Sequence, residues 1–182
     1  MFSRSLRSAE IGVIVVEELE PPQALLLRSR ADDHVAMRAF ADALQAPLPD
    51  PGKARQSPVN LTLWMAPDQW LLLTPSHIME QASPRLRTAT LNGHAAAVDV
   101  SDALSYIVLS GTGAEEVLSA GCSVDLASLA CDRVIRAPVE LADVTLLKIK
   151  ARHRFLLIIE RPIAPYLWSW LVDAALGIAP RS

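Results

Sequence analysis

The chain has 182 residues, of which 51% are hydrophobic and 20% are charged, and its formal net charge is −3. This length is enough for one substantial core or two small subdomains, and the high apolar content excludes a disordered chain. The acidic balance argues against binding to nucleic acid, which requires a clustered basic surface.

The first half of the chain predicts two strands, a helix, two strands, a helix and a last strand. Short apolar runs bounded by turn residues are typical of strands, and they lie at 11–16, 24–28, 61–65, 70–73 and 95–100. Asp32 or Asp33 is the N-cap of a helix that extends to about Gln45. A second helix is expected from about Pro75 to Arg87.

The second half repeats much of this order. The elements expected here are strands at 106–109, 144–149 and 155–159 and helices at 114–120 and 163–176. The last two strands form a hairpin. Each half is therefore interpreted as a ferredoxin-like βαββαβ unit. We expect an α+β fold with two such units in tandem, as one domain over 1–182 with pseudo-repeat halves at about 20–100 and 104–178.

Residues 155–178 are the most informative stretch, because an apolar strand leads into a helix that is apolar on nearly every side. The expected buried stripe of this helix is Ile163, Leu167, Trp170, Leu171 and Ala174, with Trp168, Val172 and Ala175 off it. A surface helix normally has a polar face. This helix is therefore either enclosed in the core or covered by a partner, and Tyr166, Trp168 and Trp170 are the candidate interface residues.

The turn from Gly111 to Gly113 lies between a predicted strand and a predicted helix, where phosphate-binding loops occur. The dinucleotide fingerprint requires a third glycine where this chain has Glu116. Glu115 and Glu116 would also repel a pyrophosphate at the start of the helix. We therefore interpret the turn as structural.

The histidines and cysteines do not form the pattern of a metal site or of a nucleophile. The scattered histidines are His34, His77, His94 and His153. Cys122 and Cys131 match neither a disulfide framework nor a CxxC motif, and no Gly-x-Ser-x-Gly elbow is present. We expect two buried thiols and no catalytic, cofactor-binding or metal-binding residue.

Asp99, Ser101 and Asp102 follow a predicted strand at the point where the two halves join. Carboxylates at such a junction can meet a ligand, or they can cap backbone groups of the crossover. We favour the capping interpretation.

Membrane and secretory signals are weak. The C-terminal apolar run, 163–178, is shorter than the roughly 20 residues that a bilayer span requires. The N-terminal run, 11–16, is followed at once by Glu17 and Glu18 and fails as a secretory signal. We expect a cytoplasmic protein without a membrane span.

Three blocks of sequence resemble one known family. The first extends from Asp99 to Leu126 and contains, in order, D-V-S, L-S-G, V-L, G-C and D-L. The second is R-P-I-A-P-Y-L-W-S-W-L-V-D-A at 161–174, and the third is A-P-D-Q-W-L-L-L at 66–73. These blocks are similar to the gamma subunit of heterotetrameric sarcosine oxidase.

The resemblance implies a fold related to the folate-binding domain of aminomethyltransferase, the glycine-cleavage T-protein. It also implies a complex that oxidatively demethylates sarcosine to glycine, with formation of hydrogen peroxide and, from tetrahydrofolate, of methylenetetrahydrofolate. FAD, FMN, NAD and tetrahydrofolate would be carried by other subunits, so this chain would be a non-catalytic accessory subunit. Its implied partners are the alpha and beta subunits, and a delta subunit where the complex has one.

Two alternatives stay open. The chain could be a stand-alone folate-binding or aminomethyltransferase-like protein, with Asp99 or Asp102 holding a pterin. A related stand-alone branch has a K-G-C-[FY]-x-G-Q-[DE] signature, of which residues 120–125 share only the Gly–Cys pair. The isolated chain could also form a homo-oligomer through its apolar helix at 163–176.

Overall fold

A computed structural model describes residues 4–30, 32–91, 95–149 and 153–178 of the chain. The chain divides into two compact units. One is continuous and extends from Pro22 to Ser101, while the other combines the described residues of 4–21 with those of 102–178. The turn of the predicted 144–159 hairpin, at 150–152, lies outside the described residues.

The continuous unit is a five-stranded antiparallel sheet with two helices. Its strands are β3 (Gln23–Arg28), β4 (Ala54–Gln56), β5 (Leu61–Ala66), β6 (Gln69–Thr74) and β7 (Ala96–Asp99). Their spatial order is β4-β5-β6-β3-β7. Leaving out the short β4, this is the order of a ferredoxin-like sheet, with the first and third strands at the centre.

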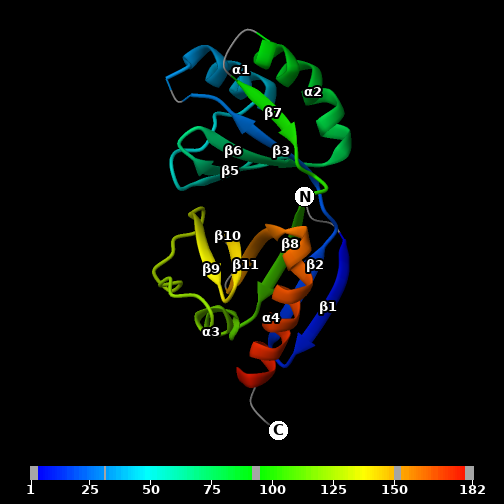
Figure 1. The fold of residues 1–182 in the computed structure, drawn as a ribbon, viewed down its shortest axis with the longest axis vertical. Coiled ribbons are helices and arrows are strands. Elements are labelled where there is room, and N and C mark those ends of the chain that lie inside the picture. Colours follow the sequence, from blue (N-terminus) through cyan, green and yellow to red (C-terminus); the bar gives the residue numbers. More distant parts are fainter. Residues whose placement is uncertain (1–3, 31, 92–94, 150–152, 179–182) are drawn as a thin grey trace. The chain divides into compact units, whose positions relative to one another are not determined.

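Helices α1 (His34–Leu44) and α2 (Ser76–Leu91) lie side by side on one face of this sheet (Figure 1). Phe40 from α1 and Leu86 from α2 share a core with Leu27 and Leu72 of the strands. The carboxylate of Asp33 accepts a hydrogen bond from the backbone N–H of Ala36 at 3.0 Å and so caps α1. The predicted N-cap is therefore confirmed.

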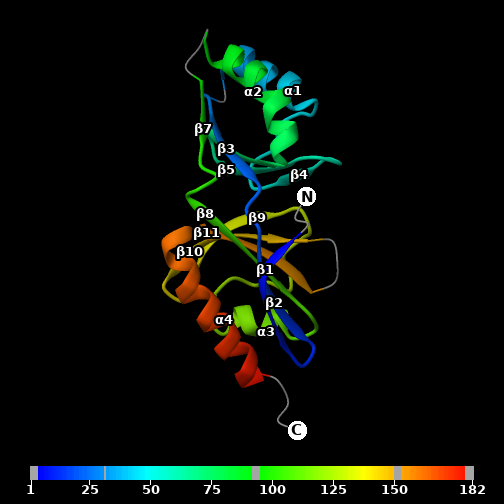
Figure 2. The ribbon, with the colours of Figure 1, turned by 90° about the vertical axis from the view of Figure 1, so that its right-hand side faces the viewer.

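The second unit contains a six-stranded antiparallel sheet. Its strands are β1 (Ser5–Ile11), β2 (Ile14–Leu19), β8 (Leu104–Ser110), β9 (Val134–Val139), β10 (Ala142–Lys148) and β11 (Arg154–Glu160). Their order is β1-β2-β8-β11-β10-β9. Helices α3 (Ala114–Ser119) and α4 (Ala164–Ile178) pack against this sheet and against each other (Figure 2).

The N-terminal hairpin belongs to the second unit, although the first unit follows it in the chain. Strand β2 pairs antiparallel with β8, with Val16 opposite Leu109. The four strands β2-β8-β11-β10 therefore have ferredoxin-like order, and the fourth strand of the fold is supplied by the N-terminus and not by residues after α4. The strand predicted at 11–16 is observed at Ile14–Leu19.

The sequence did not predict three of the strands that are observed. Strand β1 has mostly exposed side chains, β4 has three residues, and β9 contains Arg136 and Pro138. All three lie at the edge of a sheet, where a strand needs no continuous apolar pattern. The core strand β11 was predicted, and its five residues Phe155–Ile159 are all buried.

The Gly111–Gly113 turn is packed closely against the β1–β2 hairpin. A Cβ at Gly111, where φ is +107°, would lie 1.8 Å from the carbonyl oxygen of Val13. A Cβ at Gly113 would lie 2.6 Å from Ile14. Both glycines allow this close approach, and the turn therefore has a structural reason for its glycines.

Candidate functional site

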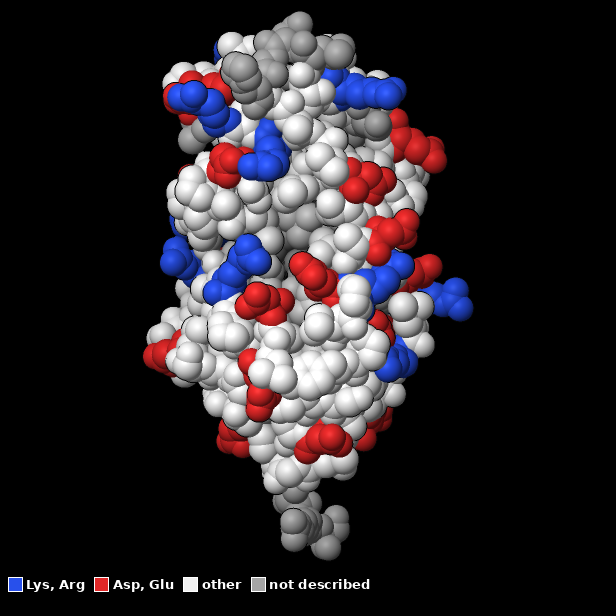
Figure 3. All heavy atoms as spheres, viewed as in Figure 1, with Lys and Arg blue, Asp and Glu red and all other residues white. Residues whose placement is uncertain are grey.

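Helix α4 buries one stripe of side chains and exposes the opposite side. The buried side chains are Ala164, Leu167, Leu171 and Ala175. The predicted stripe is confirmed for Leu167 and Leu171, but Trp170 and Ala174 are only half-buried and Ile163 is 40% exposed. The prediction also left out Ala175, which is buried. Tyr166 is 39% exposed and Leu176 58% exposed. In Figure 3 the surface over α4 is largely uncharged, with scattered acidic side chains and with basic side chains beside its upper end.

Trp168 lies on the flank of α4 that faces the N-terminal hairpin. Its side chain is half-buried and packs against the core of the second unit. The guanidinium carbon of Arg7, on β1, lies 4.2 Å from the centre of the Trp168 ring. Arg7 also forms an ion pair of 2.6 Å with Glu18 on β2. The outer side of Trp168 is therefore already in contact with a cation of the same chain.

Trp170 lies against the loop that follows α3. A Cβ at Gly121 would be only 2.6 Å from the Trp170 ring, so this position accepts only glycine without a shift of the indole. The carbonyl oxygen of Gly121 accepts a hydrogen bond of 2.8 Å from the backbone N–H of Glu140, in the β9–β10 turn. Trp170, the Gly–Cys loop and this turn are consequently neighbours.

The three candidate interface aromatics do not form one cluster. Residues two apart on a helix point about 200° apart, which places Trp168 and Trp170 on opposite flanks of the buried stripe. Tyr166 and Trp170 are four apart and lie on the same face. The structure thus brings Tyr166 and Trp170 together and separates Trp168 from them.

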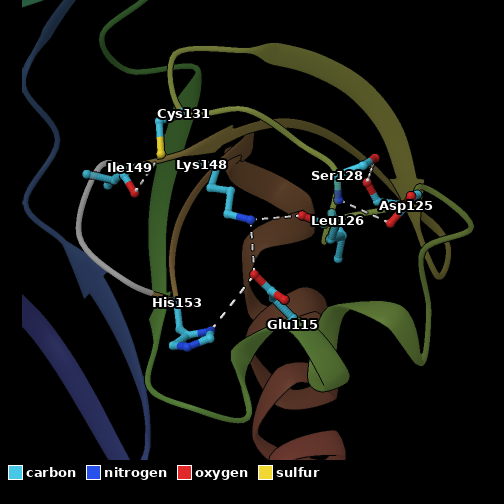
Figure 4. Close-up of polar contacts among 8 residues, drawn as sticks. All are labelled: Glu115, Asp125, Leu126, Ser128, Cys131, Lys148, Ile149 and His153. Atoms are coloured by element: carbon cyan, nitrogen blue, oxygen red, sulfur yellow. Dashed lines mark hydrogen bonds and ion pairs between the residues drawn. The ribbon is translucent and has the colours of Figure 1, made fainter.

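A second group of polar side chains lies where α3 meets β10 (Figure 4). The ammonium group of Lys148 forms an ion pair of 3.0 Å with Oε1 of Glu115 and donates to the carbonyl oxygen of Leu126 at 3.0 Å. Nδ1 of His153 is 3.9 Å from the same Glu115 oxygen. Lys148 and Glu115 are both mostly buried and satisfy each other, so this group joins α3, β10 and the intervening loop.

Asp125, Ser128 and Cys131 lie in the loop that crosses this group (Figure 4). The hydroxyl and backbone N–H of Ser128 contact Asp125, and the Ser128 hydrogen bonds lower the pKa of the Asp125 carboxyl. Sγ of Cys131 is 3.9 Å from the carbonyl oxygen of Ile149. Cys122 is buried as predicted, but Cys131 is only half-buried, because it lies in this surface loop and not under a helix.

Asp99 and Ser101 cap backbone groups next to β3. Oδ1 of Asp99 accepts hydrogen bonds from the hydroxyl and the N–H of Ser101, at 2.6 Å and 2.9 Å. The Ser101 hydroxyl in turn accepts from the N–H of Ala24 at 2.9 Å. These contacts confirm the capping interpretation. Asp102 is exposed and lies 3.7 Å from Arg161.

Neither a metal cluster nor a membrane helix is found in the part of the chain that the structure describes. No three His, Cys, Asp or Glu side chains of the described ranges gather as a metal site would require. His94 lies outside the described residues. None of the described helices combines the length and the hydropathy needed to cross a bilayer.

Comparison with known proteins gives one family and two related solved structures. The model of the "Sarcosine oxidase, gamma subunit family" matches residues 28–177. Among solved structures, the fold is similar to a chain of the heterotetrameric sarcosine oxidase from Corynebacterium sp. U-96, determined with pyrrole 2-carboxylate. The TM-score is 0.82 at 20% identity, over 96% of this chain and 89% of that chain.

A second solved structure is the glycine cleavage system aminomethyltransferase T from Bartonella henselae. Here the TM-score is 0.62 at 12% identity, over 84% of this chain but only 44% of that chain. At these identities the likenesses show the fold, and they confirm the expected α+β fold related to aminomethyltransferase. A search of curated proteins found no match.

Proposed function

The chain belongs to the sarcosine oxidase gamma subunit family, and from this we propose that it is the gamma subunit of a heterotetrameric sarcosine oxidase. The observation that carries the proposal is the family match over 28–177, which includes all the elements from α1 to β11 and nearly all of α4. The likeness to a chain of the Corynebacterium enzyme over 96% of this chain supports it.

In this proposal the chain is an accessory subunit without catalytic residues of its own. The complex would oxidatively demethylate sarcosine to glycine and form hydrogen peroxide and methylenetetrahydrofolate. Its FAD, FMN, NAD and tetrahydrofolate would be bound by the alpha and beta subunits. Two observations support the proposal that the cofactors bind to other subunits. The glycines of the 111–113 turn pack against Val13 and Ile14, and the ammonium group of Lys148 already contacts Glu115 and the carbonyl oxygen of Leu126.

Co-expression tests the proposal directly. The full chain is produced with the candidate alpha and beta subunits, and the mixture is separated by size-exclusion chromatography. We expect this chain to elute with the other subunits in a fraction that oxidises sarcosine. The proposal fails if this chain elutes alone while the alpha and beta subunits form an active oxidase.

A stand-alone folate-binding protein is the second candidate, and the fold likeness to aminomethyltransferase T favours it. Against it, Asp99 is held by two hydrogen bonds from Ser101, and the likeness extends over less than half of the aminomethyltransferase. Titration of the isolated chain with tetrahydrofolate, followed by tryptophan fluorescence, separates the two candidates. We expect no saturable quenching up to millimolar ligand, and quenching at micromolar ligand would favour the second candidate.

A further inference from the structure

An apolar patch with acidic neighbours lies beside the α3–α4 contact. We call it the α4–turn patch and define it by Tyr166 and Trp170 of α4 and Leu141 of the β9–β10 turn, with the carboxylates Glu140 and Asp173. Leu141 is 82% exposed, more than any other large hydrophobic side chain of the described residues. Nothing in the core of this unit requires an apolar residue at that position.

The members of the patch are adjacent. Tyr166, Trp170 and Asp173 are four and three residues apart on α4, so their side chains share one side of the helix. The Trp170 ring packs on Gly121, and Gly121 is hydrogen-bonded to the N–H of Glu140, next to Leu141. The helix and the turn therefore meet at Trp170 and the backbone of Glu140, and Leu141 follows directly in the turn.

Three segments at the patch carry only negative charge, while Arg161, three residues before the last of them, is paired with Asp102, and Arg7 lies over Trp168 on the other flank of α4. These segments are 114–124, 139–143 and 164–178, and together they contain Glu115, Glu116, Glu140, Asp143 and Asp173 but no lysine or arginine. Lys148 balances only Glu115. The lowest part of Figure 3 accordingly shows acidic side chains on a largely uncharged surface, and basic side chains are visible only higher up.

This charge selects among the surfaces that could cover the patch. A second copy of the chain in a two-fold contact would place the acidic neighbours of both copies against one another, which is unfavourable. An anionic membrane surface would repel them for the same reason. A protein segment with an apolar side chain beside lysine or arginine satisfies both the apolar centre and the acidic rim.

We propose that the α4–turn patch is the surface through which this chain docks onto another subunit of its complex, and that the docking segment is apolar and basic. This inference rests on the proposed function. Trp168 lies on the other flank of α4, beneath Arg7, and contributes to the fold of the second unit and not to the patch.

Binding of the full chain to the co-expressed alpha–beta subcomplex tests the inference. One variant, Leu141→Ser with Tyr166→Ser, removes apolar area from the patch, and a second, Glu140→Lys with Asp173→Lys, reverses its charge. We expect each to raise the Kd by about tenfold or more, as central interface residues do. For the wild type, Kd should rise from about 50 mM to about 300 mM NaCl, and the charge-reversed variant should lose most of this salt dependence.

Leu6→Ser and Glu10→Lys are the matched controls. Both side chains are exposed on β1 of the same unit, and we expect their Kd values to stay within about twofold of the wild type. Circular dichroism and the Tm verify that every variant is folded. We expect the spectra and the Tm to match those of the wild type, because Leu141 and Tyr166 are exposed.

Three outcomes would overturn the inference. If the wild type binds and the patch variants bind equally well, the docking surface lies elsewhere, although the subunit role stands. If the wild type does not bind the alpha–beta subcomplex at all, the proposed function and the docking surface fall together. If the isolated chain forms a dimer that Leu141→Ser with Tyr166→Ser dissociates, a second copy is the occupant.

Discussion

At the scale of single residues, Gly121 shows how a short motif is determined by packing. The Gly–Cys pair at 121–122 was one of the features on which the resemblance in the sequence was based. The structure gives it a physical reason, since the Trp170 ring lies where a Cβ of residue 121 would be, and the neighbouring Cys122 is buried in the core. A tryptophan at 170 therefore requires a glycine at 121, although the two positions are 49 apart in the sequence.

We predict that Gly121→Ala destabilises the second unit. The new Cβ would lie 2.6 Å from the Trp170 ring and 3.2 Å from the N of Glu140, so the indole and the turn must move away from it. Overpacking of this kind lowers the free energy of unfolding by about 1–3 kcal/mol. Urea unfolding measures the loss. The double variant with Trp170→Leu is the control, because removal of the ring relieves the clash. An equal loss in the presence and absence of the ring would contradict this explanation.

The Asp99–Ser101 cap predicts a dependence on pH. The hydrogen bond from the Ser101 hydroxyl holds the pKa of Asp99 below its ordinary value, and the hydrogen bond from the Ser101 N–H adds a smaller effect in the same direction. A carboxyl with a lowered pKa in the folded state stabilises that state above its unfolded pKa, and the contribution is lost as the pH falls through the folded pKa. Ser101→Ala should therefore shift the Asp99 pKa upward, as NMR titration of the carboxyl would show. If the pKa of Asp99 were the same in Ser101→Ala and in the wild type, the Ser101 hydroxyl would not be what lowers it.

At the scale of elements, the sequence predicted those that have a regular apolar pattern or a cap. Strand β11 was found from five consecutive apolar residues, and α1 from the Asp33 cap. The edge strands were missed because hydrogen bonds to one neighbour, and not burial, hold them in the sheet. The sequence also did not predict that α4 has an outer face and two different flanks, because the side chains on both flanks are apolar. The two flanks differ only in their contacts, since one packs on β1 and the other on Gly121.

Trp168→Ala tests this division of α4. From the sequence we predict that it weakens assembly more than folding, whereas its contacts with Arg7 and the core predict a loss of folding stability of about 2 kcal/mol. The Tm and the Kd for the alpha–beta subcomplex, measured on the same preparation, compare the two. Tyr166→Ala is the matched variant, for which we expect the larger change in Kd. A lower affinity of Trp168→Ala at unchanged Tm would move the docking surface to the β1 flank.

At the scale of the whole molecule, the second unit is discontinuous in sequence, and no local sequence pattern predicts this. The apolar run that contains β2 looks the same whether it pairs with β3, its neighbour in the chain, or with β8, about 90 residues later. Pairing with β8 buries Ile14, Val16 and Leu19 in the second unit. The first unit is consequently an insertion between two strands that are adjacent in one sheet, and the N-terminal hairpin can complete its sheet only when β8 and β11 are present.

This topology predicts that deletion of residues 1–20 unfolds the second unit selectively. The deletion leaves β8 with an unpaired edge and removes Ile14 and Val16, which are at most 1% exposed, from the core. Loss of two such side chains costs about 2–5 kcal/mol each if they are truncated to alanine, and deletion also exposes the core that they cover. Amide exchange of β8 should rise strongly, while amides of β3 and β6, which pair with each other in the first unit, stay protected.

The control variant is Leu6→Ser with Val13→Ser, at two exposed positions of the same hairpin. It should leave the amide exchange of β8 unchanged. If β8 remained protected after the deletion, the pairing of β2 with β8 would not be what holds that sheet together. A separate peptide of residues 1–20 should restore the protection when added, because the hairpin binds by its own strand pairing and apolar face and does not require a covalent link to β3.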